Sequence, residues 1–277
     1  MPTERNDKKI KIYSLVALAL TVVAVIVRTC CLIWFYDEDI GYYTRDVLPT
    51  LFEVLCPIAV AFFFSAFFIL KPHNIVADGK EDNVALKISS ALAAIAFGVF
   101  FVISVLSTSL VTGNVIFDLI SKISALMSIV YFAMNLFAPY TNRTVQAALG
   151  FGIIIWNICV LGITYFDIYV QLNSPEKIIL HLALVCAMVF FVSEFKCFVG
   201  ALRSKMYLFS GCCATFFLGT CSIPSIVGWS IGIANGKKYS FYNIVLFALF
   251  VYCTTRLFSF AFTKISYDKN TVEQQEL

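Results

Sequence analysis

Charged residues inside long apolar segments are the first candidates for chemistry, because a charge in hydrocarbon is costly and is usually retained for function. Arg28 lies within the first apolar segment, and Glu53 lies in the second, four residues before Pro57. A proline in a helix displaces the carbonyl four residues earlier, here that of Glu53. Two roles remain open for this pair. The first is structural: the two side chains form an ion pair, or each extends to the membrane interface. The second is a place in a solute pathway.

A polar stripe follows the fourth apolar segment. Its members are spaced by three or four residues, so they share one face of a helix. They are Asp118, Ser121, Ser124, Ser128, Tyr131 and Asn135. Lys122 is four residues from Asp118, a spacing at which two helical side chains pair. The stripe is interpreted either as a packing seam, because serine and asparagine are common between membrane helices, or as the wall of a solute pathway.

Signatures of catalysis and of ligand chemistry are missing. The sequence contains no HExxH, GxSxG, P-loop or GxGxxG motif, the patterns that mark many metalloproteases, hydrolases and nucleotide-binding proteins. Two histidines, His73 and His181, are too few for a histidine-rich metal site. The net charge of +3 is small and scattered, which argues against nucleic-acid binding. The sequence therefore predicts no enzyme, no catalytic residue, no metal and no cofactor.

The composition identifies the elements that must position these residues. Of the 277 residues, 60% are hydrophobic and 13% are charged, whereas soluble domains are about 25% charged. Apolar segments near 20 residues long predict membrane-spanning helices. Eight segments qualify: 12–35, 47–70, 86–111, 115–138, 144–166, 176–198, 206–232 and 240–262. The first is interpreted as a retained anchor because it is longer than the apolar region of a signal peptide. The prediction is an all-α bundle forming one membrane domain, residues 1–277.

Basic residues set the orientation, because they favour cytoplasmic loops. With the N-terminus inside, inner loops and tails carry fourteen Lys and Arg and outer loops carry four. The inner set is Arg5, Lys8, Lys9, Lys11, Lys71, Lys80, Lys87, Arg143, Lys196, Arg203, Lys205, Arg256, Lys264 and Lys269. The outer set is Arg45, Lys177, Lys237 and Lys238. Both termini are therefore predicted to be cytoplasmic, in a plasma or inner membrane, and Glu194 near the inner end of its span is assigned to the interface.

A tandem duplication is a further hypothesis. A shift of 130 residues places Cys56 on Cys186, and a shift of 121 places Tyr131 on Tyr252 and Asn135 on Arg256. The two halves would be residues 1–140 and 141–277, each with four spans and the same orientation. The ten cysteines all fall in or at the ends of apolar segments, so no disulfide is expected.

The favoured function is a transporter or permease for a small solute or ion. The pathway candidates, predicted to meet in one polar interior, are Arg28, Glu53, Asp118, Lys122, Ser124, Ser128, Tyr131 and Asn135. The alternative is an accessory, scaffold or sensor subunit that does not transport, and an intramembrane enzyme ranks third. The expected partners are the lipid bilayer and a small solute or ion, and the sequence names no protein partner.

Overall fold

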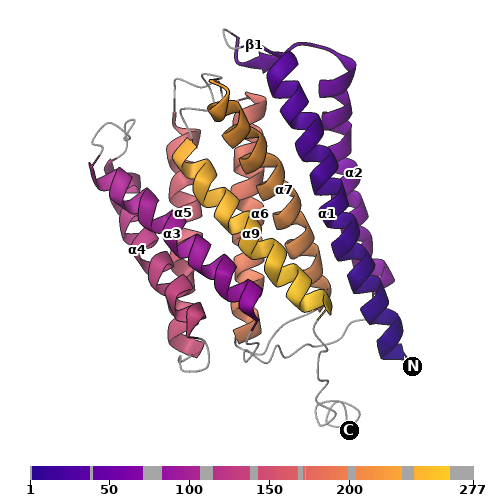
Figure 1. The fold of residues 1–277 in the computed structure, drawn as a ribbon, viewed down its shortest axis with the longest axis vertical. Helices are drawn as coiled ribbons and strands as arrows, with labels where there is room; N and C mark the ends of the chain where they lie inside the picture. The colour runs from indigo at the N-terminus through magenta and orange to yellow at the C-terminus, as the bar shows by residue number, and fades with distance from the viewer. Residues whose placement is uncertain are drawn as a thin grey trace.

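The computed structural model describes eight long helices and one short hairpin (Figure 1). The described residues are 2–37, 40–70, 83–106, 115–137, 143–167, 171, 173–198, 204–232 and 240–262. The helices are α1 (Pro2–Trp34), α2 (Val47–Ile69), α3 (Val84–Leu106), α4 (Val115–Leu136), α5 (Arg143–Tyr165), α6 (Pro175–Phe198), α7 (Ser204–Ser230) and α9 (Ser240–Phe262). The strands are β1 (Tyr36–Asp37) and β2 (Tyr42–Tyr43).

The prediction of an all-α membrane bundle is confirmed. In the described part of the chain, eight helices are long and apolar enough to cross a bilayer, and large apolar side chains cover their outer faces. The chain is thus a multi-pass integral membrane protein. The antiparallel hairpin of β1 and β2 was not predicted. It pairs Tyr36 with Tyr43 and turns through Gly41 at a φ of 75°, a conformation that glycine adopts without strain.

Helix α7 lies at the centre of the bundle. It packs against α1, α2, α6 and α9, while α3, α4 and α5 follow one another on the far side of α9 (Figure 1). The most apolar 18-residue stretch of α7 is 83% buried, the highest share of the eight helices. Its sequence is accordingly rich in small residues, which let neighbouring helix backbones approach closely.

Two glycines mark close approaches between helices. A Cβ atom on Gly219 of α7 would lie 2.6 Å from Thr21 Cγ2 of α1 and 2.8 Å from the Phe250 ring of α9. On Gly152 of α5 it would lie 2.6 Å from Met127 Cβ of α4. All three distances are shorter than the contacts of real Cβ atoms, so each glycine allows helices to touch where a side chain would separate them.

The bundle has two distinct ends. The hairpin lies at one end, called here the hairpin side, and α1 begins and α9 ends at the other, called the terminal side (Figure 1). On the terminal side, Lys205 Nζ at the start of α7 donates to the Phe67 carbonyl at the end of α2, at 2.8 Å. Such a contact satisfies a carbonyl that the helix leaves free and favours a positive charge at the helix C-terminus.

Two residues counted as loop charges in the sequence lie inside the bundle. Arg256 belongs to α9 and Lys177 to the first turn of α6, where Lys177 is buried. Hydropathy alone assigned them to loops because they stand near the ends of apolar segments. Lys71, Lys80, Arg203, Lys237, Lys238, Lys264 and Lys269 lie outside the described residues. The tandem halves stay a prediction.

Candidate functional site

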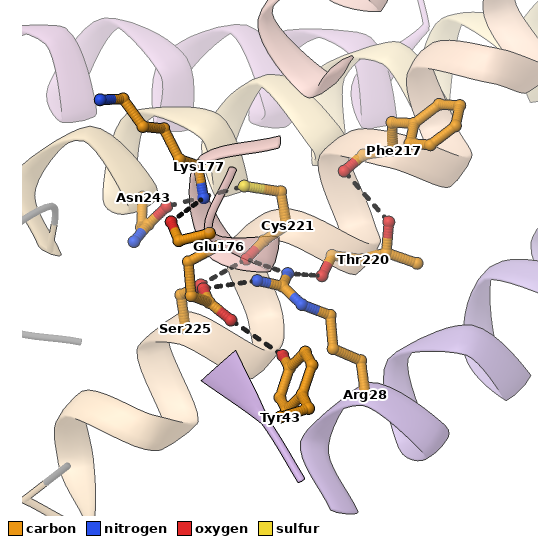
Figure 2. A network of polar contacts seen from close by, with 10 residues as sticks. Arg28, Tyr43, Glu176, Lys177, Phe217, Thr220, Cys221, Ser225 and Asn243 are labelled. Carbon is orange, nitrogen blue, oxygen red and sulfur yellow. Dashed lines mark hydrogen bonds and ion pairs between the residues drawn. The ribbon is translucent and has the colours of Figure 1, made fainter. Parts of the chain in front are cut away.

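A buried arginine organises the hairpin side of the core. Arg28 of α1 has no exposed side-chain surface, and its Nη2 atom lies 2.6 Å from Glu176 Oε2 of α6 (Figure 2). The structural Arg28–Glu53 ion pair, one of the two roles left open by the sequence, is therefore wrong. The side chain of Arg28 points into the core toward α6 and α7, whereas Glu53 is exposed on α2.

A proline explains the second contact of Arg28. Pro224 lies within α7 and has no backbone N–H, so the carbonyl four residues earlier, that of Thr220, loses its helical partner. Arg28 Nη1 donates to the Thr220 carbonyl, and it also reaches the Cys221 carbonyl at 3.2 Å. The guanidinium thus supplies the hydrogen bond that the proline removes.

Glu176 is held from three directions. It stands in the first turn of α6, where the helix dipole favours an anion, and it accepts from Arg28. Its other oxygen, Oε1, accepts a hydrogen bond from the Tyr43 hydroxyl of β2 at 3.0 Å. Burial, together with the nearby Glu176 carboxylate, raises the pKa of Tyr43 well above its ordinary value, so this hydroxyl keeps its proton and donates. We call Arg28, Glu176, Tyr43 and the carbonyls of Thr220 and Cys221 the hairpin-side cluster.

A second cluster of the same composition lies toward the terminal side. Glu194 of α6 is fully buried and forms an ion pair with Arg256 of α9, whose side chain is 18% exposed. The Tyr207 hydroxyl of α7 donates to Glu194 Oε2 at 2.6 Å. The assignment of Glu194 to the interface is therefore wrong, because the carboxylate turns inward to α7 and α9. We call Glu194, Arg256 and Tyr207 the terminal-side cluster.

Helix α6 supplies the acid of both clusters. Glu176 and Glu194 are 18 residues apart, which is five helical turns, so both project from the same face. At 1.5 Å per residue their backbones are about 27 Å apart along the axis. The two ion pairs are thus held close to opposite ends of one buried helix face.

The polar stripe of α4 faces the interior. Ser124 and Ser128 are buried and donate to carbonyls of their own helix. Gly152 of α5 lies against this stretch: a Cβ there would be 3.0 Å from the Ser124 carbonyl oxygen. This geometry favours the packing interpretation for the two serines.

The stripe changes character toward the terminal side. The Tyr131 hydroxyl lies 3.4 Å from that of Tyr252 of α9, and both tyrosines interact electrostatically with Glu194 and Arg256. Asn135 Oδ1 accepts from Gln146 of α5. Tyr131 and Asn135 thus extend the polar region beside the terminal-side cluster.

The remaining predicted residues stay apart from both clusters. Lys122 Nζ lies 2.6 Å from Asp118 Oδ2, which confirms the predicted pairing along α4. Helix α4 packs on α3 and α5 rather than on α1 or α2, so Asp118 and Lys122 do not join Arg28 and Glu53. The prediction of a single polar interior that contains all four charges is wrong, because the two pairs of helices lie on opposite sides of α7 and α9.

Replacing Glu53 should not destabilise the protein, whereas replacing a buried and paired acid should. It is exposed on α2, and it has no ion pair among the residues that the structure describes. Glu53→Gln is expected to leave the melting temperature unchanged or to raise it slightly, because it removes an unpaired carboxylate from a membrane-facing surface. Thermal unfolding in detergent measures the effect, and Asp118→Gln is measured under the same conditions for comparison. A loss of several degrees in the Glu53 variant would show that the carboxylate has a partner in the folded protein.

The cysteines give a second prediction. The structure describes the side chains of nine of the ten, and all nine are free thiols. Replacing the neighbouring Cys30 and Cys31 together by Ala should leave the melting temperature nearly unchanged under oxidising conditions, because no cross-link is lost. Unfolding curves with and without a reductant test this. A large fall in the variant, seen only without reductant, would reveal a disulfide.

Sequence reasoning missed the two acids of α6 and the role of Arg256. A signal was present, because Glu176 and Glu194 are separated by five whole helical turns and Arg256 follows a long apolar stretch. Hydropathy alone places such residues near the ends of spans, where a charged side chain is ordinarily assigned to the membrane interface. Tyr43 carried no sequence signal, since its position depends on the hairpin.

No family model, curated protein or solved structure matches this chain. Within the described residues, no group of three or more His, Cys, Asp or Glu is placed to hold a metal ion. The class of protein is therefore defined by the molecule itself: an integral membrane protein whose described residues form eight spanning helices, with one buried Arg–Glu–Tyr cluster toward each end of the core.

Proposed function

We propose that this protein is a membrane transporter that passes a small solute or ion along α7, with the two clusters closing the path in turn. The observation that carries the proposal is the pair of Arg–Glu–Tyr clusters on one face of α6, about 27 Å apart. Each joins helices that are distant in the sequence through a buried ion pair. Such pairs are costly to bury and contribute little net stability, so a functional role is a reasonable explanation for keeping two.

The stretch of α7 between the clusters supports this proposal. Thr215 lies between Tyr207 and Thr220 and is fully buried. The hydroxyl groups of Thr21 and Thr220 donate to carbonyls four residues earlier, but that of Thr215 has no partner among the described residues. A polar group at mid-helix that is left free in this way is a contact point for a passing solute.

The basic residues support the orientation. The sequence predicts an excess of Lys and Arg in the loops and tails of the terminal side, and this excess favours a cytoplasmic position for that side. We therefore propose a cell-membrane protein with both termini cytoplasmic and the hairpin outside. A reporter fused after Asp39 should then indicate the outside, and one fused after Gln275 the cytoplasm.

Alternating closure predicts reciprocal thiol accessibility. Cys221 of α7 lies at the hairpin-side cluster, and Cys253 of α9 lies in the core of the bundle. Both side chains are buried. Single-cysteine versions of each would be labelled with a membrane-impermeant maleimide in sealed vesicles of known orientation. Weakening the hairpin-side cluster with Tyr43→Phe should increase labelling of Cys221 from outside and decrease that of Cys253 from inside.

The opposite change supplies the control. Tyr207→Phe in the terminal-side cluster should reverse both effects, because the two closures share one conformational equilibrium. Cys56 on α2, which belongs to neither cluster, should label equally in every background. If each substitution changes only the nearest thiol, or neither, the clusters are static and the transport proposal fails.

One observation favours a second candidate, an accessory subunit. Helix α2 has the smallest buried share of the eight helices, 22%, and it presents Glu53 on its exposed face. A carboxylate in this position is stabilised by a basic residue of a neighbouring protein. An accessory protein would form a complex that Glu53→Lys disrupts and Glu53→Asp preserves, as measured by crosslinking in native membranes.

A further inference from the structure

We infer that the hairpin-side cluster is a binding site for a carboxylate-bearing solute, held by Arg28 in competition with Glu176. This inference rests on the proposed function, because it names the chemical class of the transported solute. The contacts of Arg28, the position of Glu176 and the contrast with the terminal-side cluster carry it.

The guanidinium of Arg28 is fixed in place but incompletely used. Its Nη1 atom is committed to the carbonyl of Thr220, which Pro224 makes available, and to that of Cys221. These neutral partners hold the group without neutralising it. The positive charge is therefore oriented by the α7 backbone and is balanced by the Glu176 carboxylate alone.

The edge of Arg28 that binds carboxylates is half filled. In arginine, Nε–H and one N–H of Nη2 point the same way and match the two oxygens of a carboxylate. Nη2 donates to Glu176 Oε2, but Nε is buried without a hydrogen-bond partner in the described part of the chain. Glu176 does not fill both positions, because its second oxygen is turned to Tyr43 and not to Nε. An unpaired donor on a buried cation is costly, and a two-oxygen ligand would satisfy it.

Glu176 is placed to be exchanged. Its side chain is 15% exposed, whereas that of Arg28 is not exposed at all, so the acid stands on the accessible side of the guanidinium. Tyr43 holds the acid from the hairpin, as Figure 2 shows. Displacement of the Glu176 carboxylate by a solute carboxylate keeps one negative charge on the guanidinium, and it breaks the ion pair that ties α6 to α1. Binding is thereby linked to opening of the hairpin-side cluster.

The terminal-side cluster provides the contrast. There both Nε and Nη2 of Arg256 contact Glu194 Oε1, and Tyr207 occupies the other oxygen. The carboxylate-binding edge of Arg256 is fully used, and Glu194 is fully buried. The two clusters share their composition, but only Arg28 keeps a free donor for a ligand.

Matched pairs of small molecules test the inference. Thermal stability and the dissociation constant of the purified full-length protein would be measured with sodium acetate against acetamide, and with sodium succinate against succinamide, at equal ionic strength. At least one carboxylate should stabilise the wild-type protein where its amide does not. Glu176→Gln should bind that carboxylate about tenfold more tightly, because it removes the charge that competes for Arg28.

A substitution at the cluster and one remote from it complete the design. Arg28→Gln should lose the carboxylate effect, and Arg28→Lys, which keeps the charge but not the fork, serves if the first variant does not fold. Asp118→Asn removes the acid of an ion pair that lies apart from both clusters, so it is the matched control and should leave the preference for carboxylate over amide intact. Tighter binding in Glu176→Gln and loss in Arg28→Lys would together establish the site.

Three outcomes overturn the inference. The first is no difference between carboxylate and amide in the wild-type protein. The second is a carboxylate effect that appears only when Glu176 is replaced, which would make the acid a permanent structural partner. The third is equal binding in Arg28→Lys. The proposed transport is tested separately, by uptake into proteoliposomes. Carboxylate binding without uptake would refute the transporter and leave the binding site standing. Uptake of an uncharged solute without carboxylate binding would refute the binding site and leave the transporter standing.

Discussion

Glu194→Gln is expected to reduce the free energy of unfolding by about 3–5 kcal/mol, the cost of removing one partner from a buried ion pair. Glu194 is fully buried, so its neutralisation leaves the guanidinium of Arg256 in the core without a counter-charge. The hydroxyl of Tyr207 loses a charge-assisted hydrogen bond at the same time. Urea or thermal unfolding in mild detergent measures the change.

The Asp118–Lys122 pair supplies the control for this experiment. It is also an ion pair at 2.6 Å, but its side chains are 16% and 22% exposed and belong to neighbouring turns of one helix. Lys122→Gln should cost less than about 1 kcal/mol, as partly exposed pairs do. A Glu194→Gln cost no larger than that of Lys122→Gln would contradict the assignment of Glu194 to a buried pair.

A double replacement separates structure from function at the same cluster. Glu194→Leu with Arg256→Met removes both charges and keeps apolar volume, a change that is often neutral or stabilising in soluble proteins. Recovery of stability with loss of the reciprocal thiol labelling would assign the pair to conformational switching. Recovery of stability with unchanged labelling would assign it to packing alone.

Arg28→Gln is also expected to reduce the free energy of unfolding by about 3–5 kcal/mol. Unlike the cost of Glu194→Gln, this cost should depend on whether Pro224 is present. The substitution leaves Glu176 unpaired and also leaves the Thr220 carbonyl without a donor. In a Pro224→Ala background, the new backbone N–H of residue 224 can donate to that carbonyl. The cost of Arg28→Gln should therefore be lower by about 1 kcal/mol, the net value of one hydrogen bond.

A double-mutant cycle isolates this coupling. The four proteins are wild type, Arg28→Gln, Pro224→Ala and the double variant, compared by their free energies of unfolding. Pro49→Ala, at the start of α2, is the matched proline control and should show no coupling to Arg28. Strict additivity of Arg28 and Pro224 would mean that the guanidinium does not replace the missing backbone donor.

The sequence by itself determined the class of the protein and the number of spans. Hydrophobicity acts locally: any segment of about 20 apolar residues must form a helix in the bilayer, whatever its neighbours are. The Asp118–Lys122 pair was predictable for the same reason, since both residues lie on adjacent turns of one helix. The buried face of the α4 stripe was also predictable, because it follows from helical periodicity alone.

Only the tertiary structure decided the partners of the buried charges. Arg28 is 148 residues from Glu176, and Glu194 is 62 residues from Arg256. Depth in the membrane restricts which charges can meet, but the order in which the helices pack selects among those at equal depth. The sequence offered an ion pair between Arg28 and Glu53 on consecutive helices. In the structure, α7 packs between α1 and α6, and the carbonyl that its proline frees is turned toward Arg28. The orientation of each helix about its own axis, which side-chain packing sets, turned Arg28 into the core and Glu53 out of it.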